Sequence, residues 1–207
     1  GSTMREDFGK PLADEAARFF RNQMAKATLA AVDVLLLRHG LYHHSYVERV
    51  KRVGRLPETS GDDAEWFSWA LNEKLHPNGS PLDGPAMLTH YDRTHDLFTR
   101  HMLTAISSFL GRPLASVPEV ADCFERHWRF RVRRAAKILA KGRTVTRRSR
   151  SLDLAQMYLF AAYSPAGIDA QLAQKAAVLL NGIAPEVNAD THWHQLRCVA
   201  AQMRLDP

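Results

Sequence analysis

Apolar residues recur at spacings of three and four along nearly the whole chain, and this periodicity constrains the fold more than any other feature. On an α-helix, residues at these spacings share one face. Runs of β-branched residues, which are typical of strands, are missing. The sequence therefore predicts an all-α protein, a single globular, bundle-like domain of about seven or eight helices.

Capping residues and helix breakers divide this pattern into segments. We expect one helix that Ser60 or Asp62 caps and that ends at Leu75, and another that Gly111 stops. The other expected helices cover residues 11–38, 42–53, 151–163, 168–181 and 188–205. In the helix over residues 85–110, the stripe expected to face the core is Leu88, Tyr91, His95, Phe98, Met102, Ala105 and Phe109.

Residues 116–150 contain the whole of the chain's excess positive charge. Ser116 and Glu119 fit a capping box and Gly142 fits a C-terminal cap, so we expect a helix followed by a polar loop. Outside residues 125–150, the chain has 17 Lys and Arg against 21 Asp and Glu. Residues 125–150 contain a single acid, Glu125, and eleven cationic residues: Arg126, Arg129, Arg131, Arg133, Arg134, Lys137, Lys141, Arg143, Arg147, Arg148 and Arg150. We call these eleven residues the basic stretch.

Charge concentrated in this way predicts a polyanionic partner. Nine of the eleven cations are Arg, which binds phosphate bidentately and stacks on bases. We therefore expect contact with the phosphate backbone of RNA or DNA, as an accessory subunit of a nucleoprotein complex or a DNA-associated regulator. A protein-interaction module with an acidic partner chain is an alternative. A membrane is not expected to be a partner, because exposed aromatics do not interleave with the charges.

One short segment suggests a catalytic alternative. The sequence from Arg38 to His43 resembles the R-polar-x3-H motif of HEPN-type helical ribonucleases. That resemblance implies that Arg38 and His43 act on the scissile phosphate of RNA without a metal. The competing interpretation is a helix C-terminus with cations that complement the helix dipole.

Two arrangements of metal-ligand residues are also present. The pairs His90-x-Asp92 and His95–Asp96, with His101 beyond them, resemble the metal set of the all-α HD phosphohydrolases. That resemblance implies His43 or His44 as the upstream ligand and Asp122 as the downstream one, although a core position suits His95 as well. Two i, i+4 pairs, Cys123 with His127 and His194 with Cys198, provide the four ligands of a structural zinc site. Free Cys packed as a small hydrophobe is the alternative for the second arrangement. We expect neither a metal nor another cofactor, and a binding protein rather than an enzyme.

Residues 152–181 have the helix–turn–helix outline of DNA-reading motifs. In that interpretation Gln171 and Gln174 contact bases and Lys175 contacts phosphate, whereas a plain packing hairpin is the alternative. Residues 1–3 are interpreted as a cloning remnant. The expected organisation is a helical domain over 4–150 and a C-terminal part over 151–207. Two cysteines and the lack of a signal peptide after Met4 predict a reduced, cytoplasmic location.

Overall fold

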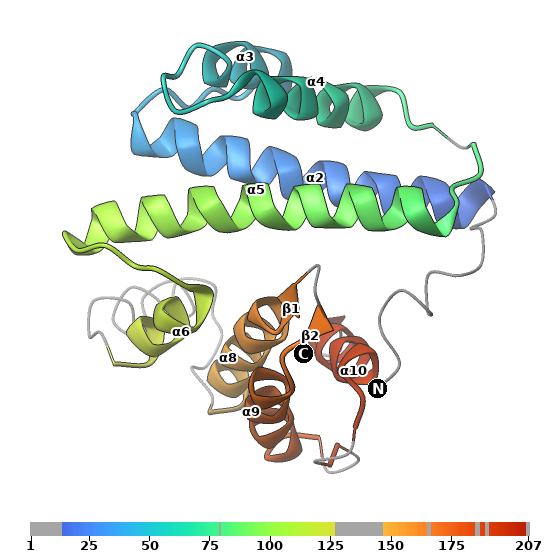
Figure 1. The fold of residues 1–207 in the computed structure, drawn as a ribbon, viewed down its shortest axis with the longest axis vertical. Helices are drawn as coiled ribbons and strands as arrows, with labels where there is room; N and C mark the ends of the chain where they lie inside the picture. The colour runs from blue at the N-terminus through green and yellow to red at the C-terminus, as the bar shows by residue number, and fades with distance from the viewer. Residues whose placement is uncertain are drawn as a thin grey trace. The chain divides into compact units, whose positions relative to one another are not determined.

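A computed structural model describes residues 14–78, 80–126, 147–164, 167–184, 187–188 and 191–205. These residues form eight helices and one very short strand pair, which confirms the all-α prediction (Figure 1). The chain separates into two compact units, Gly1–Pro113 and Leu114–Pro207. The domain boundary expected after residue 150 falls inside helix α8 (Arg147–Ala161).

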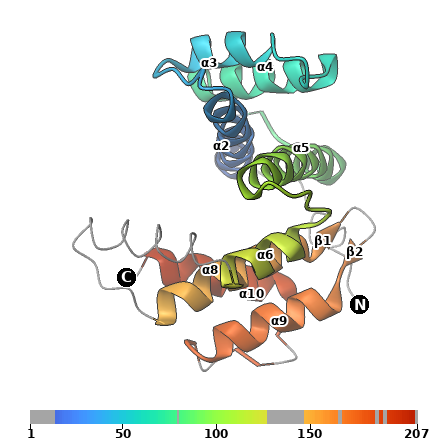
Figure 2. The same cartoon turned by 90° about the vertical axis from the view of Figure 1, so that its left-hand side faces the viewer.

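The first unit consists of α2 (Asp14–Arg38), α3 (Tyr46–Val53), α4 (Gly61–Leu75) and α5 (Gly84–Leu110). Helix α2 lies at its centre and packs against the other three, and it runs alongside α5 (Figures 1 and 2). All four helices contribute to one core. Its buried residues are Ala31, Val32, Leu35, Leu36, Val53, Leu56, Trp66, Phe67 and Leu97.

Local capping interactions fix the ends of α4 and α5. The Ser60 hydroxyl accepts a hydrogen bond from the Asp63 backbone N–H at 3.1 Å, which confirms the predicted start of α4. Gly111 ends α5 with a φ of 68°, a left-handed conformation that favours glycine, as expected from the sequence. Helix α3 begins at Tyr46 rather than at residue 42, because Gly40, with a φ of 67°, and the residues after it form a turn first.

The buried face of α5 differs from the predicted one. Thr94, Leu97 and His101 are buried, whereas Leu88 and Tyr91 of the expected stripe are only half-buried. Thr94 tolerates burial because its hydroxyl accepts a hydrogen bond from the Trp66 indole N–H at 3.3 Å. Thr94 and His101 therefore belong to the buried face of α5, although the spacing of apolar residues does not identify them.

The second unit consists of α6 (Val117–Arg126), α8, α9 (Ala170–Asn181) and α10 (Trp193–Leu205). Helix α8 contacts each of the other three. Between α8 and α9 the expected simple turn is replaced by an antiparallel pair, β1 (Tyr163–Ser164) and β2 (Gly167–Ile168), so the prediction of a chain without strands is wrong here. Fully buried residues on these elements include Val120, Ala155, Leu180 and Leu196.

Candidate functional site

The basic stretch lies largely outside the described residues. Arg129, Arg131, Arg133, Arg134, Lys137, Lys141 and Arg143 are among those that the structure does not describe. The backbone of Arg126 ends α6, and the backbones of Arg147, Arg148 and Arg150 lie in the first turn of α8. Helix α8 thus begins four residues earlier than predicted. Its three arginines belong to a helix rather than to a loop.

The division into two units assigns the net charge to one of them. Residues 1–113 contain 14 Lys and Arg and 14 Asp and Glu, so the first unit has no net charge. Residues 114–207 contain 14 Lys and Arg and 8 Asp and Glu. The chain's formal charge of +6 therefore belongs entirely to the second unit, and the basic stretch supplies it.

The start of α8 is electrostatically unusual. The partial positive charge of a helix N-terminus favours acidic residues, yet the first turn of α8 has none and contains Arg147, Arg148 and Arg150. Cations at this position repel the helix dipole. An anion bound there would interact favourably with both the arginines and the backbone N–H groups of that turn.

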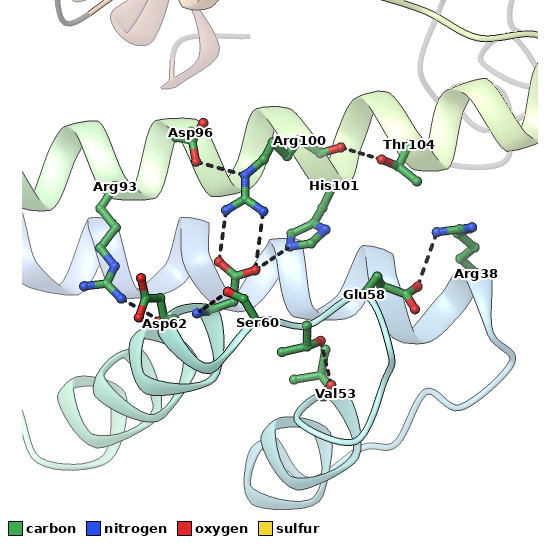
Figure 3. Close-up of polar contacts among 12 residues, drawn as sticks. Arg38, Val53, Glu58, Ser60, Asp62, Arg93, Asp96, Arg100, His101 and Thr104 are labelled. Atoms are coloured by element: carbon green, nitrogen blue, oxygen red, sulfur yellow. Dashed lines mark hydrogen bonds and ion pairs between the residues drawn. The ribbon is translucent and has the colours of Figure 1, made fainter.

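Arg38 and His43 take part in separate contacts. Arg38 Nη1 lies 3.3 Å from a carboxylate oxygen of Glu58 (Figure 3). The same oxygen also hydrogen-bonds His39 Nε2. The hydrogen bond from His39 lowers the pKa of Glu58, so its carboxylate stays charged beside Arg38. His43 Nδ1 accepts from the Ser45 backbone N–H at 3.1 Å, just before α3. A carboxylate beside Arg38 repels phosphate, so this geometry favours a structural role for the pair.

The residues of the HD-like metal set point to different neighbours. The His90 ring lies 5.1 Å from that of Trp66, and the Asp96 carboxylate accepts a hydrogen bond from Arg100 at 2.9 Å. The His95 ring stacks on Tyr91. Within the described part of the chain, no three His, Cys, Asp or Glu side chains gather where they could hold a metal ion. The described residues therefore give no support to the HD-like interpretation.

The zinc hypothesis involves residues that the structure describes only in part. Cys123 is buried on α6 and Cys198 is exposed on α10. His127 and the side chain of His194 lie outside what the structure describes. The four-ligand site stays a prediction.

The helix–turn–helix interpretation receives one new constraint. Lys175 Nζ lies 5.5 Å from the centre of the Tyr158 ring, so Lys175 of α9 contacts α8 within the second unit. Gln171 and Gln174 are exposed on α9. The contact of Lys175 is what a packing hairpin predicts, and the DNA-reading role of the two glutamines stays a prediction.

The strongest polar cluster of the first unit joins α4 to α5. Arg100 donates to the buried Asp63 carboxylate at 2.9 Å and to Asp96 at 2.9 Å (Figure 3). Burial raises the pKa of Asp63, but hydrogen bonds and charge from Arg100 outweigh it, and the net pKa lies below the usual value. His101 Nε2 lies 4.0 Å from the same carboxylate, and burial lowers the pKa of this histidine. Because every charge is matched by a neighbour, this cluster is suited to holding two helices together.

A second ion pair, in which the arginine is buried and the aspartate half-buried, was not predicted. Arg49, 5% exposed, donates to both carboxylate oxygens of Asp33 at 2.7 and 2.8 Å. The one signal in the sequence was an aspartate inside the most apolar run, residues 27–37. A charge in such a run needs a buried partner, although the sequence does not identify which cation provides it.

Comparisons of the chain with protein-family models, with curated protein sequences and with solved structures give no match. No helix in the described ranges is long and apolar enough for a membrane crossing. A function can therefore be proposed only from the chain's own charges and contacts.

Proposed function

We propose that this protein binds nucleic acid, RNA or DNA, through the basic stretch of its second unit. The observation that carries the proposal is the division of charge, since the first unit is neutral and the second holds the entire excess of six positive charges. A surface of this kind binds phosphate backbones and releases their counterions. The protein is accordingly a binding subunit that contacts the backbone rather than particular bases.

Two features support a phosphate backbone as the anion. Nine of the eleven cations are Arg, whose planar guanidinium matches phosphate geometry and is less strongly hydrated than an ammonium group. The N-terminus of α8 adds backbone N–H groups next to Arg147, Arg148 and Arg150. Cations and helix dipole repel each other there until an anion is present, which favours a bound state.

The test is binding of labelled single-stranded RNA and double-stranded DNA across a salt series. The test variant carries Arg129→Glu, Arg133→Glu and Arg147→Glu. The matched control carries Arg18→Glu, Lys26→Glu and Arg112→Glu, which are exposed residues of the neutral first unit. Both variants have the same net charge, so only the position of the reversed charges differs between them.

We expect log affinity to fall steeply with log salt, by about 0.9 for each neutralised phosphate on duplex DNA. The test variant should flatten this slope by about one for each arginine that contacts a phosphate, and the control should not. An equal effect of both variants would contradict the proposal, because total charge alone would then explain binding. Absence of binding at low salt would refute it and favour an acidic protein partner. Probe shortened during incubation would favour the nuclease interpretation of Arg38 and His43.

A further inference from the structure

Residues 37–47, where α2 ends and α3 begins, expose an unusual number of large apolar side chains. Among the described residues nine large hydrophobic side chains are exposed, and five of them lie in this segment. They are Leu37 (62% exposed), Leu41 (41%), Tyr42 (46%), Tyr46 (37%) and Val47 (51%). We call residues 37–47 the α2–α3 corner (Figure 1). A cluster of exposed apolar side chains marks a binding surface.

The guanidinium of Arg49 contacts both tyrosine rings of the corner. The guanidinium carbon of Arg49 lies 4.1 Å from the ring centre of Tyr46 and 4.9 Å from that of Tyr42. Arg49 is itself fixed by Asp33 and by the carbonyl of His44, to which it donates at 2.9 Å. The rings are therefore ordered before any ligand arrives, which lowers the entropic cost of binding.

Aromatic rings lie in the corner, and positive charge lies in the corner and in the residues that follow it. Residues 42–46 provide four aromatic rings, and those of His43 and His44 are 4.2 Å apart. Residues 38–55 contain five Lys and Arg and a single acid, Glu48, in a unit that has no net charge. Arg38 pairs with Glu58, the buried Arg49 pairs with Asp33, and Lys51 and Arg52 share Glu48. Three acids therefore offset these five cations, and an excess of two positive charges remains.

Flat rings beside cations suit a ligand with flat faces and negative charge. The unpaired bases of a single strand stack on exposed aromatics while its phosphates meet nearby Lys and Arg. Bases inside a duplex are already stacked on each other and do not present their faces. The aliphatic side chains of Leu37 and Val47 would suit a protein partner. Such a partner does not account for four rings and five cations within residues 38–55.

We propose that unpaired bases of single-stranded nucleic acid stack on Tyr42 and Tyr46 at the α2–α3 corner. This inference rests on the proposed function and extends it, because it gives the protein a preference for single strands. The basic stretch contacts the phosphate backbone, and the corner adds a contribution that depends little on salt.

The test uses the full chain with single-stranded RNA and duplex DNA probes. Tyr42→Ala and Tyr46→Ala should each weaken single-strand binding about tenfold, within the usual range for one lost base–aromatic stack. Duplex binding and the salt slope should not change, because no phosphate contact is lost. Tyr42→Phe keeps the ring and should bind like the unmodified protein. Val47→Ser is the matched control for loss of an exposed apolar side chain.

Circular dichroism first establishes that each variant is folded. Tyr42→Phe is compared with Tyr42→Ala, because the phenylalanine keeps a ring in contact with Arg49. Unchanged single-strand affinity in both alanine variants would overturn the inference and assign the corner to a protein partner. An equal loss in Val47→Ser, or an equal loss for duplex, would overturn it too. If the Arg129, Arg133 and Arg147 reversals still weaken binding in those cases, only the stacking inference fails and the proposed function stands.

Discussion

Removing Arg100 should destabilise the first unit much more than neutralising its buried partner Asp63. The Asp63 side chain is 7% exposed, whereas that of Arg100 is 48% exposed and also contacts Asp96. Arg100→Met leaves a buried carboxylate without its main partner. Asp63→Asn leaves a guanidinium that reaches both water and Asp96. The two substitutions break the same ion pair, yet they leave very different groups behind.

The magnitudes follow from that difference in exposure. An uncompensated buried charge costs about 3–5 kcal/mol of stability. Because water has partial access to the site near Arg100, we expect Arg100→Met to lower the free energy of unfolding by about 3 kcal/mol. Asp63→Asn loses part of one charge-assisted hydrogen bond, about 1 kcal/mol. For a unit of this size each kcal/mol lowers Tm by about 4 °C, so we expect decreases of about 12 °C and 4 °C.

The pH dependence provides the decisive comparison. In the unmodified protein the pKa of Asp63 is lowered, so its contribution is present above about pH 3.9 and is lost as pH falls through the lower folded value. Without Arg100, burial raises the pKa of Asp63 instead, and protonation relieves the penalty. The Tm deficit of Arg100→Met, followed by circular dichroism, should therefore shrink between pH 7 and pH 4. Equal deficits for both variants, or a deficit independent of pH, would refute this reasoning.

Two further measurements test the half-buried His90, the buried His101 and the end of α5. Burial lowers the pKa of His90 and His101, so the unfolded chain binds protons first and stability should fall as pH drops below about 6.5. In thermal unfolding, the Tm of a His90→Phe, His101→Leu double variant should fall less between pH 7.5 and 5.5 than that of the unmodified protein. Gly111→Ala should lower the free energy of unfolding by about 1 kcal/mol in chemical denaturation, because its φ is 68°. No atom crowds the new methyl group at either Gly111 or Gly61, and Gly61 has no positive φ, so Gly61→Ala should not lower the free energy of unfolding.

Sequence reasoning succeeded where the determining interaction is local. The start of α4 depends on a hydrogen bond between Ser60 and Asp63, three residues apart. The end of α5 depends on the conformation of Gly111 alone. Signals of this length are visible in a sequence, because the capping residue and the backbone group that it satisfies lie within one turn.

Contacts between distant segments could not be predicted in the same way. Asp63 and Arg100 are 37 residues apart, and Arg21 donates to the carbonyls of Asn78 and Ser80, which are 57 and 59 residues away. A sequence shows that such charges exist but not which partner each one meets. The prediction of the buried face of α5 was wrong for a related reason, because Thr94 is buried with its hydroxyl hydrogen-bonded to Trp66, 28 residues away.

The contrast between the two units also bears on why the basic stretch exists. In the first unit, arginines such as Arg21, Arg49 and Arg100 meet acids or carbonyls within the fold, so their charge serves stability. Eleven cations with one acid among them cannot be neutralised locally, and the rest of the second unit offers only seven more acids. Their mutual repulsion disfavours a compact state, and the helix dipole of α8 adds to it. An external polyanion would remove both penalties, and for this reason we propose that the basic stretch serves binding rather than folding.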